Sequence, residues 1–190
     1  SIGASVGKWT MVSGPSSIPP AFTDDTDPNT VVAVPLHGEY VFEWRESNIH
    51  NQTCSTSEEV NIHFIAIPDP YAGPDKTVCG NETYLEATLN AGVGYWVSMT
   101  PFHIIDGNDP NSSAVVTNLA TPETYTYIWY EINEYNGTQC VGFDSVLITY
   151  VPIPDMTITE IDSGDVELDF TGGFPPFELL WSNGETVADL

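Results

Sequence analysis

The sequence predicts an all-β protein made of tandem β-sandwich modules in a rod-like array, and two observations carry this prediction. First, aromatic and apolar residues alternate with polar ones over short segments such as 40–45 and 125–129, which are bounded by Gly, Pro, Asn and Asp. Second, two stretches about 86 residues apart share one pattern. With about five to seven short strands per repeat, the pattern indicates a sandwich.

The repeat matches residues of the same type in both copies. Trp44 corresponds to Trp129, Cys54 to Cys140 and Val60 to Val146. Each copy ends in Ile-Pro-Asp, at residues 67–69 and 153–155. Proline restricts the backbone there, so we expect neighbouring modules to be joined with little slack.

Three domains follow from this pattern. Residues 1–69 form a sandwich that lacks its opening strands, and residues 70–155 form a complete one. Residues 156–190 leave the repeat and begin a module of another type, with Asn183-Gly184 as a hairpin turn. We expect both ends to be cut from a longer polypeptide, because the chain starts in a strand-like pattern and stops just after a turn.

The composition limits the classes of partner that the chain is expected to bind. The 190 residues include 27 acidic side chains against three Lys and Arg, a formal net charge of −24, while hydrophobic residues make up 41%. The apolar content is that of a globular protein. Such an acidic surface repels phosphate, so we expect no nucleic acid partner. No apolar run is long enough to span a bilayer, so we expect no direct membrane insertion.

The three cysteines can be interpreted from the repeat. Cys79 lies in the first strand of the second module and Cys140 near the start of its last strand, so we predict a disulfide between them. Closing that loop would stabilise the fold by roughly 4 kcal/mol. The partner of Cys54 falls ahead of Ser1, which leaves Cys54 unpaired by truncation. The alternative is three buried free thiols in a reducing compartment.

Two acidic loops occupy equivalent places in the two modules. One contains Asp24, Asp25, Asp27 and Asn29, and the other contains Asp106, Asn108, Asp109 and Asn111. Calcium binds about six to eight oxygen atoms from such side chains, so these loops are candidate calcium sites, although no cofactor is required. The EF-hand spacing is absent, and Asx-rich turns explain the same residues equally well.

We expect no enzymatic activity. The sequence contains no HExxH, GxGxxG or Walker motif, and its one GxSxG match, at residues 3–7, lies in a strand-like pattern and not at the strand-to-helix turn that this motif requires. Tyr95, Tyr130 and Tyr135 have the chemistry of a sugar-binding platform, but also that of aromatic residues covering the edge of a sandwich.

Residues 71–155 resemble a known module. The resemblance rests on Ala72-Gly73-Pro74-Asp75, Val78-Cys79, Gly94-Tyr95-Trp96 and Cys140. In these features the segment is similar to the PKD-like or Ig-like repeats of very large surface proteins in Bacteroidetes. Residues 1–69 match the same pattern without its opening. The resemblance implies tandem Ig/PKD-like β-sandwich modules.

Residues 156–190 resemble the start of a different repeat. Gly172-Gly173-Phe174-Pro175-Pro176-Phe177 followed by Trp181-Ser182-Asn183-Gly184 is similar to the SprB-type repeat of gliding-motility adhesins, with Phe177 in place of the usual tyrosine. The second half of that repeat would lie beyond Leu190.

These resemblances imply a protein exported by type IX secretion and displayed outside the cell, at its surface, as a gliding adhesin or filament. Its partners would be neighbouring modules of the same chain and surface glycans or other cell-surface proteins. The motif Asp144-Ser145-Val146 fits an O-glycosylation site at Ser145, for which a plain strand-edge serine is the alternative.

We therefore expect a non-enzymatic structural and adhesive segment of a large secreted bacterial surface protein. A carbohydrate-binding accessory region of a secreted enzyme also fits, and it requires an exposed aromatic platform. A eukaryotic receptor ectodomain is the other alternative. It is permitted by the odd number of cysteines and by N-glycosylation sequons at Asn51, Asn81, Asn111 and Asn136.

Overall fold

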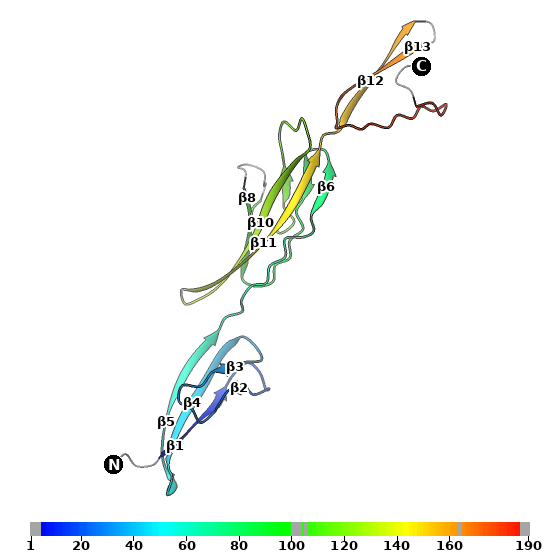
Figure 1. Cartoon of the computed structure of the whole chain (residues 1–190). Coiled ribbons are helices and arrows are strands. Elements are labelled where there is room, and N and C mark those ends of the chain that lie inside the picture. The colour runs from blue at the N-terminus through cyan, green and yellow to red at the C-terminus, as the bar shows by residue number, and fades with distance from the viewer. Residues whose placement is uncertain (1–4, 100–103, 105, 163–164, 187–190) are drawn as a thin grey trace. The chain divides into compact units, whose positions relative to one another are not determined.

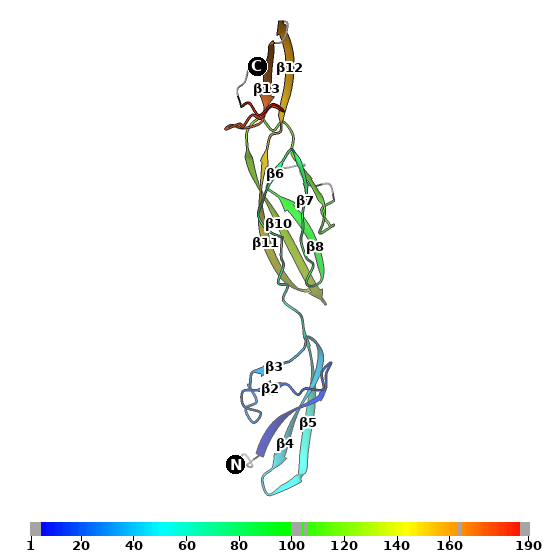
Figure 2. The same cartoon turned by 90° about the vertical axis from the view of Figure 1, so that its right-hand side faces the viewer.

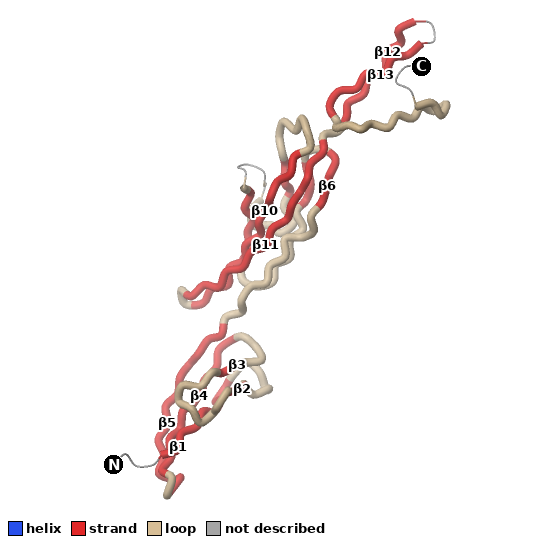
Figure 3. Tube along the Cα trace, in the orientation of Figure 1, coloured by secondary structure: helices blue, strands red, loops and turns tan. Residues whose placement is uncertain are grey.

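The structure, a computed structural model, describes residues 5–99, 104, 106–162 and 165–186. This described part consists of strands, turns and loops and contains no helix (Figure 3). Contacts divide the chain into two compact units, Ser1–Ala66 (unit 1) and Ile67–Leu190 (unit 2).

Unit 1 is a small β-sandwich. Its main sheet is antiparallel, in the order β1 (Ser5–Ser13), β4 (Gly38–Asn48) and β5 (Asn51–Phe64). The short pair β2 (Ala21–Phe22) and β3 (Val32–Ala33) lies beside one face of this sheet (Figures 1 and 2). Alternation along β4 buries Tyr40 and Phe42 on that face, where Phe22 meets Phe42 edge to face with ring centroids 5.8 Å apart.

Unit 2 contains a fuller sandwich of the same type. Its main sheet has the order β6 (Lys76–Cys79), β11 (Thr138–Val151), β10 (Glu123–Tyr135) and β8 (Val93–Ser98). The β6–β11 pair is parallel and the other pairs are antiparallel. A second layer contains β7 (Glu82–Tyr84) and β9 (Ser113–Val115), with Ile104 bridged to Ala114.

The last described strands of unit 2 form a hairpin of β12 (Pro154–Asp162) and β13 (Asp165–Gly172). Phe177 then packs edge to face on Phe170, with ring centroids 4.7 Å apart. Further on, Gly184 N–H donates to the Trp181 carbonyl at 2.9 Å, which closes the turn predicted at Asn183-Gly184. Trp181 N–H also donates to the Glu185 carbonyl at 2.9 Å, so the turn has the hydrogen bonds of a three-residue hairpin loop, although the described residues on either side of it are not in strands.

The core of the sandwich in unit 2 is built from residues on alternate positions of its strands. It comprises Ala72, Leu85, Ala87, Trp96, Ala114, Val116, Tyr127, Trp129, Val146, Ile148 and Tyr150. The Tyr127 hydroxyl lies 3.1 Å from that of Tyr150, which in turn donates to the Ala114 carbonyl at 3.3 Å. Burial, together with the hydrogen bond to Tyr150, raises the pKa of Tyr127 well above its ordinary value.

The strand registers confirm the internal repeat. Trp9 on β1 lies opposite Trp44 on β4, and Trp96 on β8 lies opposite Trp129 on β10. The ring centroids are 5.2 Å apart in both pairs, at interplanar angles of 52° and 55°. The predicted fold class, all-β with tandem Ig-like β-sandwich modules, is therefore confirmed.

Candidate functional site

The two acidic loops are equivalent in structure as well as in sequence. Each lies against the first tryptophan of its sandwich: Trp9 N–H donates to the Asp25 carbonyl at 2.8 Å, and Trp96 N–H donates to the Gly107 carbonyl at 2.6 Å. The loops therefore have fixed positions beside β1 and β8.

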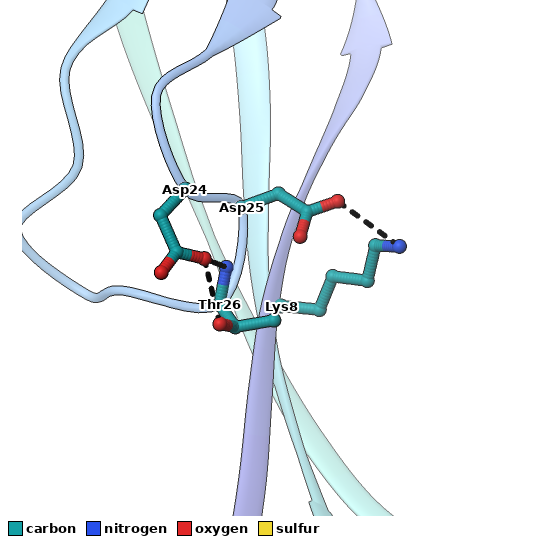
Figure 4. A network of polar contacts seen from close by, with 4 residues as sticks. All are labelled: Lys8, Asp24, Asp25 and Thr26. Carbon is teal, nitrogen blue, oxygen red and sulfur yellow. Dashed lines mark hydrogen bonds and ion pairs between the residues drawn. The ribbon is translucent and has the colours of Figure 1, made fainter.

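In unit 1 the loop is organised by its own side chains (Figure 4). Asp24 Oδ1 accepts hydrogen bonds from the Thr26 hydroxyl at 2.7 Å and the Thr26 N–H at 2.9 Å. These bonds hold the pKa of Asp24 below its ordinary value. Asp27 Oδ1 accepts from Asn29 N–H at 2.9 Å, and Asp25 pairs with Lys8 at 3.0 Å. These are the contacts of consecutive Asx turns.

The loop of unit 2 repeats this geometry. Asp106 Oδ1 accepts from Asn108 N–H at 3.0 Å, and Asp109 Oδ1 accepts from Asn111 N–H at 2.9 Å. Asp109 N–H also donates to the Asp106 carbonyl at 3.3 Å, as Asp27 N–H does to that of Asp24.

These contacts bear on the calcium prediction. Four of the loop carboxylates form Asx turns, because each accepts a hydrogen bond from the backbone N–H two residues further along the chain. Among the described residues, no cluster of three or more His, Cys, Asp or Glu side chains is arranged to hold a metal. Calcium binding by the loops stays a prediction.

The predicted disulfide is wrong. Cys79 pairs with Val151 because β6 runs parallel to β11, whereas Cys140 pairs with Asn133 near the other end of β11. At about 3.3 Å per residue, the stretch of β11 from Cys140 to Val151 is about 35 Å long, and a disulfide needs Cα atoms within about 7 Å.

All three cysteines are free, and they are not buried thiols either. Cys54 and Cys79 are exposed, and Cys140 is half-buried. The explanation that Cys54 lost its partner by truncation therefore falls with the disulfide from which it was deduced.

Ser145 is exposed on β11, on the face of the sheet opposite to the core. Its neighbour Asp144 has a structural role, because Asp144 Oδ2 accepts a hydrogen bond from Ala72 N–H at 2.9 Å. Glycosylation of Ser145 stays a prediction.

The outer face of the main sheet of unit 2 carries a row of aromatic side chains. Tyr130 on β10 lies between Tyr95 on β8 and Phe143 on β11 in the strand register. The Tyr95 and Tyr130 rings stack at 5.4 Å and 11°, and the Tyr130 and Phe143 rings lie 5.5 Å apart at 37°. Phe143 is 66% exposed. Tyr135, further along β10, is also exposed but lies outside these two contacts.

The equivalent positions of unit 1 are polar. Lys8 lies opposite Arg45, and Arg45 lies opposite Ser57, in the places that the three aromatic residues occupy in unit 2. Arg45 donates to the Ser55 hydroxyl at 2.6 Å. The two sandwiches therefore share a core pattern but present different outer faces.

Glu131 is a structural residue that was not assigned a role from the sequence. It is fully buried, and its carboxylate accepts hydrogen bonds from Asn90 N–H at 2.9 Å, Ala91 N–H at 3.0 Å and the Trp129 indole at 3.0 Å. The repeat contained a signal, since Glu46 follows Trp44 at the same spacing. A buried carboxylate with this many donors fixes the chain that supplies them.

No family model matches the chain, and no curated protein matches it in sequence. Solved structures that match include human CDH23 EC21-23, with 11% identity, a TM-score of 0.42, and coverage of 96% of this chain and 77% of that one. Another is human Mucin-like Protocadherin EC1-2, with 12% identity, a TM-score of 0.34, and coverage of 77% and 85%. In the described residues no helix is long and apolar enough to cross a membrane.

Proposed function

We propose that this chain is a non-enzymatic structural and adhesive segment of a large secreted protein at the surface of a bacterial cell, of the gliding adhesin or filament type. The observation that carries the proposal is the contrast between the two units. Their paired tryptophans and strand registers match, whereas the same outer positions hold Lys8, Arg45 and Ser57 in one unit and Tyr95, Tyr130 and Phe143 in the other.

This contrast suits a scaffold that presents different contact surfaces along one chain. Aromatic residues give large contact areas at a low cost in side-chain entropy, and they are enriched where binding energy is concentrated. The exposed row on unit 2 is therefore the proposed contact face, and the acidic remainder keeps the chain soluble.

The contact face is tested by exchanging it for that of unit 1. The variant carries Tyr95→Lys, Tyr130→Arg and Phe143→Ser, and Tyr84→Ser, at a position 65% exposed on β7, is the matched control. Beads coated with each protein are washed under flow over bacterial cells and over polysaccharide surfaces. We expect the exchange to reduce retention by about tenfold and the control to leave it unchanged. Equal retention of all three proteins would contradict the proposal.

The bacterial surface location rests on the sequence resemblance and has its own test. Antibodies against the chain should label intact cells of the source organism, and its full-length sequence should end in a type IX secretion domain. Mass spectrometry of the native protein should find an O-glycan on Ser145. N-glycans on the sequons instead would favour a eukaryotic receptor ectodomain.

A carbohydrate-binding accessory region is the second candidate, and the aromatic row favours it. Sugar rings bind to exposed aromatic faces, and Phe143 offers one beside the stacked Tyr95 and Tyr130. Selective binding on a glycan array that disappears in the exchanged variant would support this function over general adhesion.

Calcium is the candidate ligand of the Asx loops, and thermal melting with calcium or with a chelator tests it. A higher melting temperature in calcium that Asp106→Ala and Asp24→Ala abolish would support a site. Identical melting curves would leave the loops as turns alone.

A further inference from the structure

The outer face of the main sheet of unit 2 is apolar well beyond its aromatic row. In the strand register, the row of Tyr95, Tyr130 and Phe143 lies between two others that cross the same three strands, β8, β10 and β11. All but one of the nine residues in the three rows are aliphatic or aromatic, and none is charged. We call them the outer block: Val97, Ile128 and Ser145; Tyr95, Tyr130 and Phe143; Val93, Ile132 and Val141.

The outer block is exposed to solvent. Val93, Val141 and Phe143 are 67%, 51% and 66% exposed, and Leu147 in the adjoining row of β11 is 45% exposed. Together with the half-buried members of the block, these side chains present an apolar area of about 600 Å², which is at the upper end of the range for the largest patch on a monomeric protein. A patch of this size indicates a binding surface.

Unit 1 shows that the fold does not require an apolar face at this place. By register with the paired tryptophans, each position of the outer block has an equivalent on β1, β4 or β5. Eight of the nine equivalents are polar, and four of these are charged. They are Thr10, Glu43 and Glu59; Lys8, Arg45 and Ser57; Val6, Ser47 and Ser55.

The geometry of the rings indicates what kind of surface fits the outer block. The Tyr95 and Tyr130 rings are nearly parallel, at 11°, with centroids only 5.4 Å apart. Parallel rings this close cannot lie side by side in one plane, so they form an offset stack and cover part of each other's faces. Ring edges and aliphatic side chains are left to meet a partner, and side chains of this kind interdigitate with those of a second pleated sheet.

Charge selects among the partners that could supply such a sheet. The chain has a formal net charge of −24, so it repels anionic surfaces at long range. Two outer blocks meet without bringing any of their own charged groups together. The outer face of unit 1 is a poor partner for the block, because Lys8, Arg45, Glu43 and Glu59 would lose water against apolar side chains.

We propose that the outer block of unit 2 binds the outer block of a second copy of this chain, face to face, about a two-fold axis near the central Tyr130. This inference rests on the contact face proposed above and names its partner. A two-fold contact uses the same patch on both copies. The two blocks together bury about 1,200 Å², which is the lower limit of the standard size for a specific interface.

The dependence on salt is the first test, with the full chain in sedimentation experiments. Two copies of so acidic a chain repel each other, and raising NaCl from about 0.01 M to about 1 M shortens the screening length from about 30 Å to about 3 Å. We expect the association constant of the dimer to rise at least about tenfold over this range. A dimer that weakens with salt would be held by charges, which overturns the proposal.

Substitutions in the outer block are the second test, measured at the higher salt concentration. The variant carries Tyr130→Arg and Phe143→Ser, the residues of unit 1, and Tyr84→Ser, 65% exposed on β7, is the matched control. We expect the variant to raise the dissociation constant at least about tenfold and the control to leave it unchanged. If the indole resonances show that the double variant is unfolded, Phe143→Ser alone decides. An equal dissociation constant in variant and control overturns the proposal.

The contact itself is located by isotope-filtered NMR on a mixture of labelled and unlabelled chains. We expect contacts between copies at Tyr130, Val141 and Phe143. Contacts at Met156 and Ile158 instead, which are exposed on β12, would place the dimer on another apolar surface and overturn the proposal.

The sedimentation and flow experiments separate this inference from the proposed function. A chain that stays monomeric at every salt concentration overturns the inference. If the exchanged variant nevertheless loses retention on cells, the contact face stands and binds a different partner. Dimers that form through the outer block while retention is unaffected would support the inference and contradict the adhesive function.

Discussion

Replacing Glu131 by glutamine tests whether a single buried carboxylate holds residues 71–92 in place, the stretch before β8 that we call the covering segment. The substitution keeps the size of the side chain but exchanges one acceptor oxygen for an NH₂ donor. In the best orientation the remaining oxygen keeps its bonds to Asn90 N–H and the Trp129 indole. The new NH₂ group then faces Ala91 N–H, which in the unsubstituted chain donates to Glu131 Oε2 at 3.0 Å. One hydrogen bond is lost and a buried donor is left opposite another donor.

The magnitude follows from that geometry. An unsatisfied buried donor costs about 1–3 kcal/mol, so we expect Glu131→Gln to lower the free energy of unfolding of unit 2 by about 2 kcal/mol. With a urea dependence of about 2 kcal/mol per molar, the unfolding midpoint falls by about 1 M. Glu46→Gln is the matched control, because the Glu46 carboxylate is exposed and, among the described residues, accepts a hydrogen bond only from the Trp44 indole, at 3.4 Å. It should cost less than about 0.5 kcal/mol.

The indole N–H resonances report each unit separately in one urea titration. Trp96 and Trp129 belong to unit 2, and Trp9 and Trp44 belong to unit 1. Glu131→Gln should move the transition of the first pair and leave the second pair unchanged. If the midpoint of unit 2 shifts by no more than it does in Glu46→Gln, Glu131 does not anchor the segment.

Three other predictions concern the core and the thiols. Burial raises the pKa of Tyr127 in the folded state, so its contribution to the free energy of unfolding is complete below about pH 10 and is lost as the pH rises towards the folded-state pKa. Unit 2 should therefore be less stable in alkali, and Tyr127→Phe should reduce that loss of stability. Identical alkaline titrations of the two proteins would contradict this. Gly94→Ala places a Cβ 2.1 Å from Trp129 Cζ2 and should cost about 1–3 kcal/mol in urea unfolding. Gly7→Ala meets the half-buried Trp44 at 2.0 Å and should cost less, because that ring can move outward; an equal cost would refute the comparison. Thiol labelling of the denatured, unreduced chain should find all three cysteines free, whereas a single reactive thiol would restore the disulfide.

The sequence was most informative where a local pattern sets the structure. Alternation along residues 40–45 and 125–129 predicted strands with their aromatic side chains on one face, and β4 and β10 have that arrangement. The repeat in the sequence also corresponds to a repeat in strand register. In each copy the two tryptophans lie opposite each other on neighbouring strands, because the same core is built twice.

The predictions that failed depended on how strands far apart in the sequence pair with each other. The spacing of Cys79 and Cys140 does not say whether β6 runs parallel or antiparallel to β11, and the parallel pairing places the two thiols at opposite ends of that strand. Glu131 was missed because a carboxylate in a strand is usually solvated, and only the fold supplies the two backbone donors from the covering segment.

The parallel pairing that separates the cysteines has a mechanical consequence for unit 2. A pull on the two ends of its sandwich draws the N-terminal end of β6 one way and the C-terminal end of β11 the other. Since the strands are parallel and paired from Lys76–Ile148 to Cys79–Val151, the load runs along them and strains these hydrogen bonds together. An antiparallel pair pulled at one end would instead open one bond at a time. Rupture of β6 from β11 is therefore the expected barrier to forced unfolding, and its rate sets how long the sandwich survives under tension.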